Sequence, residues 1–430
     1  MQIIVALVHV ILLAAFSYWL WKRESSSLRI YFWPALIIKV LAGVALGLLY
    51  SHYYSVGDTF QYFEDGKKLT ALAHDNVKTY FAFLWSGNES FDIWTTIVLR
   101  EPRALFLIKI VSLLSLITLN NYWIISIYFS MASFYGAWLL VKQIVVLSQS
   151  FKHAAVAAFL FFPSVVFWSS GLIKESLALA CLFFLCSLFL KTWIKEKLNL
   201  IEWVFLILTL WMLWNLKYYY LAVFLPIAFT SLIVKIYIIP ALNTKKVFIR
   251  MMIWLMVLVV LVVAISFFHP NFHPEQFLQV IASNNQAFMK LSDSTDAIHY
   301  FDLQPSVKSV LINSAWALIS GLFRPFVWES HTVFQFIVAV ENAFIIVLTI
   351  VALFRLRKVF QSPHRLLVFS IVSYTVMLCI FLALSTPNFG TLARYKVGFM
   401  PFFLFVILID NPILSRISSF YQRSISNLVR

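Results

Sequence analysis

Long apolar stretches, separated by short polar segments, run along the whole chain of 430 residues. A membrane-spanning helix needs about 20 consecutive and mostly apolar residues. The sequence therefore predicts an all-α, polytopic transmembrane helical bundle that forms a single integral membrane domain over residues 1–430, with about 11 crossings. The predicted crossings are residues 2–21, 31–51, 122–141, 154–170, 172–190, 201–216, 219–238, 248–268, 331–354, 366–385 and 397–410.

The basic residues between these stretches orient the chain. Lysine and arginine collect in cytoplasmic loops of membrane proteins. If residues 22–29 are cytoplasmic, all the strongly basic loops fall on that same side: around 142–152, then 191–197, 235–250, 355–365 and 416–430. We therefore expect a multi-pass protein of the inner (cytoplasmic) membrane. The first apolar stretch lacks a basic start, so we expect a retained helix and not a cleaved signal peptide.

Two long regions fall on the outer side, residues 52–121 and residues 269–329. Each contains a short apolar piece, 104–119 and 310–323, that is interrupted by polar residues. We interpret these pieces as juxtamembrane or re-entrant helices, which are tolerated where protein or a wet cavity shields the backbone. The aromatic residues of the first region suit amphipathic helices that lie in the plane of the interface.

Composition excludes the soluble classes of protein. The chain is 62% apolar and 12% charged, whereas a soluble domain carries about 25% charged residues. A net charge of +15 could indicate a nucleic-acid partner, but the basic residues lie in loops between apolar stretches, so we expect none. The three cysteines fall inside apolar stretches, which supports neither a disulfide framework nor a zinc site.

Ionisable residues near membrane depth are candidates for function, because their desolvation must be compensated. The first candidate is Asp58, within Gly57-Asp58-Thr59 and close to Tyr62. An aspartate here can act as a general base or as a ligand to a hard cation. It can also cap a helix, since Gln61 follows three residues later as in a capping box. Both interpretations are kept.

The second candidate covers residues 163–175, which we predict to be a hairpin tip on the outer side. Proline, serine and glycine break the helix there, so that polar groups could face the same aqueous pocket as Asp58. Lys174 could hold a phosphate, and Glu175 could join a metal site or a pair of bases. The alternative is an interfacial ion pair beside the aromatic anchor Trp168.

Two further outer segments carry cations, Arg324 with Glu329, and Arg394 with Lys396. The planar guanidinium group of arginine matches phosphate oxygens. Arg324, Arg394 and Lys396 are therefore predicted to form a phosphate or diphosphate clamp, although each could instead extend to lipid headgroups.

Two other lysines lie in or beside apolar stretches. Lys217 lies in the short outer turn 215–220, where an interfacial aromatic belt is the favoured interpretation. Lys39 lies within a predicted crossing, and we expect it to extend to the inner edge of the membrane.

The topology and these motifs together resemble the GT-C superfamily of membrane glycosyltransferases, in particular the PMT-like enzymes that use polyprenyl-phosphate-linked sugars. Asp58 looks like the acidic residue of their first outer loop, and Lys174-Glu175 looks like their second polar site at the next outer hairpin. The resemblance covers roughly residues 1–240, and 104–119 would match the juxtamembrane helix. The chain departs from the pattern by an extra first crossing and by a glutamate where aspartate is more usual.

This resemblance implies transfer of a sugar from a polyprenyl-phosphate donor to a glycan or lipid acceptor, as in the synthesis of cell-envelope polysaccharide. Asp58 would be the base, and Glu175 would assist it or bind a divalent cation, Mg or Mn. The phosphate would be held by Lys174 and the predicted clamp, and Trp168 and Trp328 would face sugar or isoprenoid. All of these groups would open onto one chamber at the extracytoplasmic boundary.

Two other functions remain open at this point. A polysaccharide polymerase or ligase that uses polyprenyl-diphosphate glycans would depend on the outer arginines and would need no acid. A lipid or solute transporter would have polar residues deep in several crossings and internal repeats.

Overall fold

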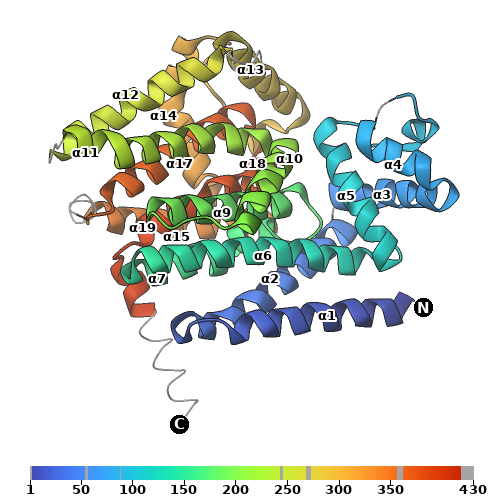
Figure 1. The fold of residues 1–430 in the computed structure, drawn as a ribbon. Coiled ribbons are helices and arrows are strands. Elements are labelled where there is room, and N and C mark those ends of the chain that lie inside the picture. Colours follow the sequence, from blue (N-terminus) through green and yellow to red (C-terminus); the bar gives the residue numbers. More distant parts are fainter. Residues whose placement is uncertain are drawn as a thin grey trace. The chain divides into compact units, whose positions relative to one another are not determined.

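The computed structural model describes residues 2–53, 57–87, 89–242, 246–267, 273–355 and 362–417. The fold is all-α, with 84% of residues in helices and no strand in these ranges. The chain divides into two compact units, the first made of residues 1–146 and 159–219 and the second of residues 147–158 and 220–430. Figure 1 shows their helices. The single membrane domain stays a prediction, and each unit is described by itself below.

Eight helical stretches in the described ranges are long and apolar enough to cross a membrane. They are α1 (Gln2–Lys22), α2 (Ser26–His52), α6 (Tyr122–Leu147), α9 (Lys174–Trp193), the stretch Leu200–Leu242, α12 (Val247–Ser266), α15 (Val333–Leu353) and α17 (Arg365–Ser385). A ninth would be the pair Phe389–Gly398 and Met400–Leu408, bent by 64°. This pair contains α18 (Phe389–Tyr395), η8 (Lys396–Gly398) and α19 (Met400–Leu408). These helices support a multi-pass membrane protein.

The difference from the eleven predicted crossings arises in three places, of which the bent pair, at predicted crossing 397–410, is one. Predicted crossings 201–216 and 219–238 fall in one stretch, Leu200–Leu242, which comprises α10 (Leu200–Ile233), the π-helix η4 (Val234–Ile238) and α11 (Ile239–Leu242). Its 43 residues would extend about 65 Å if regular, about twice the hydrocarbon core of a bilayer. The helix is broken at Lys217, which has φ −149° and ψ 67°, within the predicted turn, and its division into two crossings stays a prediction.

The predicted crossing 154–170 is three short pieces and not one helix. They are α7 (Lys152–Val156), a π-helical turn η3 (Ala157–Phe161) and α8 (Pro163–Trp168), preceded by η2 (Gln149–Phe151). Proline cannot donate a backbone hydrogen bond and clashes with the preceding turn, so Pro163 starts a new helix. The exact number of crossings stays a prediction.

Both outer regions contain short helices. Region 52–121 holds α3 (Asp58–Asp75), α4 (Val77–Ser86), η1 (Asp92–Thr96) and α5 (Pro102–Thr118). Region 269–329, described from His273, holds α13 (Pro274–Leu291), η6 (Ser294–Asp296), α14 (Val307–Phe323) and η7 (Val327–Glu329). The two apolar pieces predicted as short helices are α5 and α14, each 17 residues long. Their position at the interface stays a prediction.

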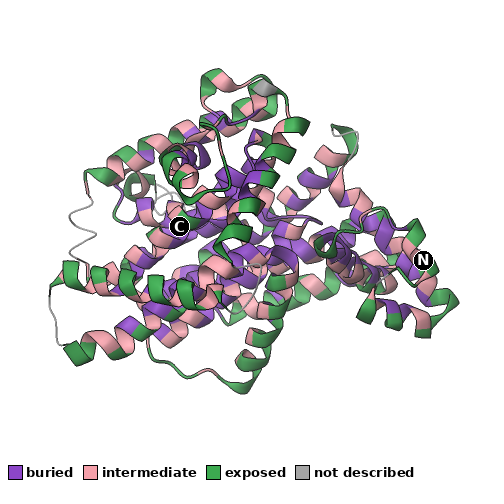
Figure 2. Cartoon of the chain, turned by 90° about the horizontal axis from the view of Figure 1, so that it is seen from above, coloured by how far each residue is buried: buried purple, intermediate pink, exposed green. Residues whose placement is uncertain are grey.

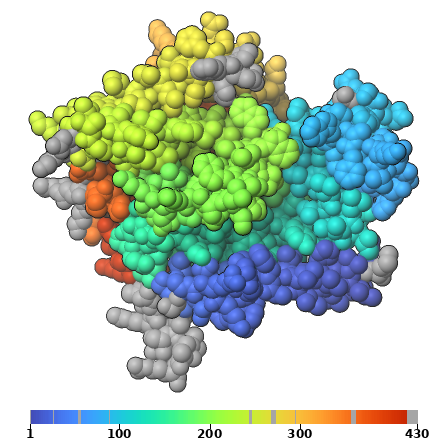
Figure 3. All heavy atoms as spheres, in the orientation of Figure 1, coloured from blue at the N-terminus to red at the C-terminus, as the bar shows by residue number. Residues whose placement is uncertain are grey.

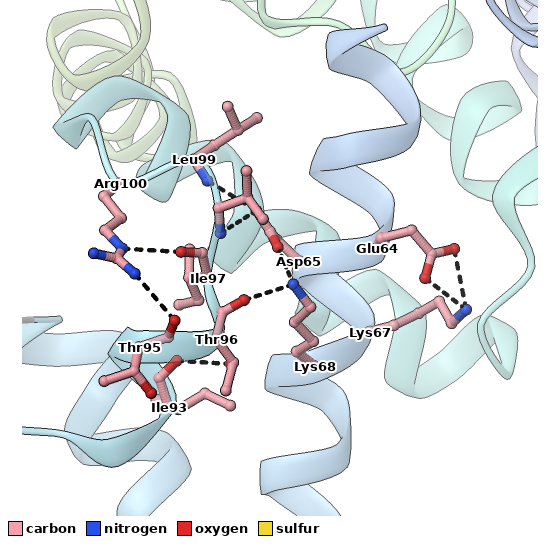
Figure 4. A network of polar contacts seen from close by, with 11 residues as sticks. Glu64, Asp65, Lys67, Lys68, Ile93, Thr95, Thr96, Ile97, Leu99 and Arg100 are labelled. Carbon is pink, nitrogen blue, oxygen red and sulfur yellow. Dashed lines mark hydrogen bonds and ion pairs between the residues drawn. The ribbon is translucent and has the colours of Figure 1, made fainter. Parts of the chain in front are cut away.

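A buried carboxylate fixes the first outer region (Figure 4). Asp65 of α3 is fully buried, and it accepts hydrogen bonds from Lys68 Nζ at 2.7 Å and from the backbone N–H groups of Val98 and Leu99 at 3.1 and 3.0 Å. Gly66 lets α3 approach α5 closely, since a Cβ there would lie 2.7 Å from Val111 Cγ1. These contacts set the position of α3, and with it the position of Asp58.

Buried and exposed residues are distributed as expected for helices in lipid. Figure 2 shows buried residues on the inner sides of the helices and exposed residues on their outer sides. In α1 and α12, only 11% of the apolar window is buried, and α1 forms a continuous strip of surface in Figure 3. Apolar surface of this extent is unusual in soluble monomers and marks contact with a membrane or a protein partner.

Candidate functional site

The turn between α8 and α9, in the first unit, is recessed along α2. Lys39 Nζ of α2 donates hydrogen bonds to Ser169 Oγ and to Val166 O, the latter at 3.5 Å. Lys39 is 13 residues from each end of α2 (52 − 39 and 39 − 26), which is about 20 Å of helix. The turn therefore begins halfway along α2, and Ser169 is fully buried. For these residues the sequence predicts an outer hairpin tip.

The expectation for Lys39 itself is wrong. Its side chain is buried and binds Ser169, so it does not extend to the inner edge of the membrane. A lysine buried at this depth needs polar partners, and the C-terminal end of α8 supplies them. Lys39 thus fixes the short helix that leads into the turn.

Two glycines allow the turn to lie against α2 and α6. Gly171 has φ +73°, a conformation that side chains with a Cβ rarely adopt. Its N–H donates a hydrogen bond of 2.9 Å to Ser130 Oγ of α6. On the α2 side, a Cβ at Gly43 would lie 3.1 Å from Gly171 N. The turn is therefore held from both sides through the backbone of Gly171.

The start of α3 meets the same turn. Thr59 Oγ1 donates a hydrogen bond of 2.8 Å to Leu172 O and lies 2.9 Å from Tyr122 Oη. Asp58 is the first residue of α3, and the residue before it, Gly57, is the N-cap. The interpretation of Asp58 as the N-cap of a capping box is therefore wrong, because the N-cap lies one residue earlier. A carboxylate in the first turn still interacts favourably with the positive end of the helix.

Lys174 joins the first two candidate segments. Its Nζ lies 5.4 Å from the centre of the Tyr62 ring of α3, a distance typical of cation–π contacts. Tyr62 is buried. Trp168, at the end of α8, is half-buried and packs edge-on against Phe167. The structure thus brings the Asp58 segment and the Lys174-Glu175 segment together within the first unit.

Glu175 has a buried partner that the sequence analysis did not identify. Lys217 Nζ lies 2.9 Å from Glu175 Oε1, and their side chains are only 3% and 1% exposed. Lys217 also lies 5.5 Å from the ring of Tyr219. The interpretation of Lys217 as part of an interfacial belt is therefore wrong. In the sequence, the signal that could have pointed to this partner was a lone lysine between two apolar stretches.

The expected divalent cation stays a prediction. Asp58 and Glu175 were to hold it, but the Lys217 ammonium lies beside Glu175 and would repel a second positive charge at that distance. No group of three or more His, Cys, Asp or Glu residues in the described ranges is placed to hold a metal ion.

The second unit brings together part of the predicted phosphate clamp. Arg324 binds Glu329 through two nitrogens, Nε–Oε1 at 2.9 Å and Nη2–Oε1 at 2.6 Å. The guanidinium group also lies 4.9 Å from the centre of the Phe389 ring. Lys396 is buried, and its Nζ donates to Arg324 O at 2.6 Å. Arg324, Glu329 and Lys396 form one cluster, in which a carboxylate already occupies the arginine fork.

Two other predicted residues, Arg394 and Trp328, also belong to the second unit. Arg394 of α18 is half-buried and stacks near the adjacent Tyr395, at 5.4 Å. Trp328 is 79% exposed and stacks on Phe326. Asp58 and Glu175 belong to the first unit and Arg324 and Arg394 to the second, so a chamber shared by all four stays a prediction.

The comparison with known proteins adds no relative. The chain matches no protein-family model, no curated protein and no solved structure. The resemblance to GT-C enzymes, carried by Asp58 and Lys174-Glu175, stays a prediction.

Proposed function

We propose that this protein is a membrane glycosyltransferase, which moves a sugar from a polyprenyl-phosphate-linked donor to a glycan or lipid acceptor on the extracytoplasmic face. One observation carries the proposal: the N-terminal ends of α3 and α9 meet in the first unit. Thr59 binds Leu172 O, and Lys174 lies over Tyr62. We therefore treat Asp58 and the Lys174-Glu175 segment, which come from distant parts of the sequence, as one site, which we call the α3–α9 site.

The charge of the α3–α9 site suits an anionic ligand. Lys174 and Lys217 balance the two carboxylates, Asp58 and Glu175, so these side chains carry no net formal charge (2 − 2). The N-terminal end of each helix adds roughly half a positive charge. These charges are partly buried, so water and salt screen them less than charges on a surface. A lipid phosphate would supply the missing negative charge.

The proposed reaction increases the negative charge of that phosphate. The bond between the sugar C1 atom and the phosphate oxygen breaks, and its electron pair stays on the phosphate. The oxygen of the acceptor hydroxyl forms a bond to C1, and its proton moves to the Asp58 carboxylate. The phosphodiester with one charge becomes a monoester with about −1.5 to −2. Lys174 and Lys217 would stabilise this growing charge.

The test is sugar transfer by the full-length protein in liposomes. A panel of polyprenyl-phosphate hexoses serves as donors and alkyl glycosides serve as acceptors, and released polyprenyl phosphate is measured. Asp58→Asn should lower the rate about 10²–10⁴-fold, as expected for loss of a general base. Glu64→Gln is the matched control, because Glu64 is an exposed carboxylate on the same helix, where it pairs with Lys67. It should leave the rate unchanged.

Two outcomes would contradict the proposal. Undiminished transfer by Asp58→Asn would remove the proposed base. Loss of transfer in Arg394→Ala, with full transfer in Asp58→Asn, would instead support a polymerase or ligase that depends on the outer arginines.

A further inference from the structure

The buried pair of Glu175 and Lys217 lies where α9 begins and where α10 is broken. Burying two charges costs several kcal/mol per ion in solvation, and such pairs often stabilise a protein no more than apolar residues would. Charged residues inside membrane proteins are more often found where ligands bind or pass. The pair is therefore a candidate for ligand binding beyond its structural role.

The position of Lys217 is unfavourable in one respect. Its ammonium group lies beside the first turn of α9, and Lys174 is the first residue of that helix. The N-terminal end of a helix carries partial positive charge, so it favours anions and disfavours cations. Glu175 provides the anion that keeps Lys217 there.

The first turn of α9 has further capacity for an anion. Ser176 is fully buried, and its hydroxyl has no hydrogen-bond partner among the residues that the structure describes. A hydroxyl and the N–H groups of a helix start are groups that commonly bind phosphate. Together with Lys174 and Lys217, they offer donors of the kind that a phosphate group needs.

We propose that Glu175 and the phosphate of a polyprenyl phosphate compete for Lys217. Glu175 holds Lys217 at the start of α9 in the empty protein, and the ligand phosphate replaces this carboxylate when it binds. This inference rests on the proposed function, because it names Lys217 as a ligand-binding residue of the α3–α9 site. Glu175 then opposes binding, which is the reverse of the assisting role that the sequence suggests.

The signs of the mutant effects follow directly. Glu175→Gln removes the carboxylate that competes for Lys217 and should lower the Kd for polyprenyl phosphate about tenfold, as expected when one charge pair is broken in a partly screened site. Lys217→Gln should raise the Kd about tenfold. The double variant should behave as Lys217→Gln, because Glu175 acts only through Lys217. Lys217→Arg keeps the charge and should stay within about threefold of the wild type.

The experiment uses the full-length protein in nanodiscs of phosphatidylcholine. Binding of polyprenyl phosphate, polyprenol and inorganic phosphate is measured by native mass spectrometry, with Lys67→Gln, at a half-exposed lysine of α3, as the control. Elution volume and thermal unfolding show that each variant folds. Tighter binding of polyprenyl phosphate by Glu175→Gln, with weak binding of polyprenol, supports the proposal.

Other outcomes overturn it in distinct ways. Weaker binding by Glu175→Gln would mean that the pair is structural. If polyprenol binds as tightly as polyprenyl phosphate, the site does not recognise the phosphate group. If inorganic phosphate alone shows the same pattern of mutant effects, the ligand is free phosphate and not a lipid. Unchanged binding in every variant would place the lipid elsewhere, while the Asp58→Asn transfer assay could still support the transferase.

Discussion

Gly43→Ala is expected to displace the turn that carries Lys174 and Glu175. The added methyl group would lie well inside contact distance of Ser130 Oγ and 3.1 Å from Gly171 N. The serine hydroxyl must move, and the Gly171 N–H then loses the partner that it holds at 2.9 Å. A buried N–H without a partner costs about 1–3 kcal/mol, and crowding of a packed interior costs about 1–3 kcal/mol more. The free energy of unfolding should therefore fall by about 2–6 kcal/mol.

A double-mutant cycle with Ser130→Ala isolates this contact. Ser130→Ala alone also leaves the Gly171 N–H without its partner, so the double variant should cost about 1–3 kcal/mol less than the sum of the single variants. Unfolding by SDS in mixed micelles measures each free energy. Ala45→Val, at an exposed position of α2, is the control and should change it by less than about 0.5 kcal/mol. A stable Gly43→Ala protein, or additivity within about 0.5 kcal/mol, would refute the described packing.

Three further changes test other parts of the structure. Asp65→Asn replaces a carboxylate that binds Lys68 and two backbone N–H groups. It should lower the free energy of unfolding by about 2–3 kcal/mol and speed hydrogen exchange at those two amides. Protection of the amides at the wild-type level would contradict this. Lys39→Met removes a buried charge, so stability should change by less than about 1 kcal/mol or rise, while binding of polyprenyl phosphate weakens because Lys39 holds the turn before Lys174; unaltered binding would argue against this positioning role. Burial, and then the nearby Lys235, lower the pKa of His364, so the unfolded chain binds this proton more readily and stability should fall as the pH drops below about 6.5. His364→Gln should reduce that loss between about pH 7 and pH 5, and an identical pH profile would contradict it.

The helices themselves could be predicted well from the sequence. Apolar runs of sufficient length gave α1, α6 and α12, and the polar residues around 215–220 gave the break in α10. The interruption at Pro163 was also visible, because proline ends a helix locally. Its depth was not visible, since that depends on Gly43 of α2 packing against Gly171, two residues that are far apart in the sequence.

The candidate site could be predicted only in part. Asp58 and Lys174-Glu175 were identified because ionisable residues stand out beside apolar stretches. The partner of Glu175 was not, because hydropathy cannot distinguish an interfacial lysine from a buried one such as Lys217. The same ambiguity led to the wrong expectation for Lys39, whose partner is set by tertiary packing.

The most direct test of the α3–α9 site is a cryo-EM map of the full-length protein in nanodiscs with bound polyprenyl phosphate. We predict density for the phosphate about 3 Å from Lys217 Nζ, at the first turn of α9 and beside the start of α3, with Glu175 displaced from Lys217. Phosphate density at Arg324 or Arg394, with the Glu175–Lys217 pair intact, would contradict this account.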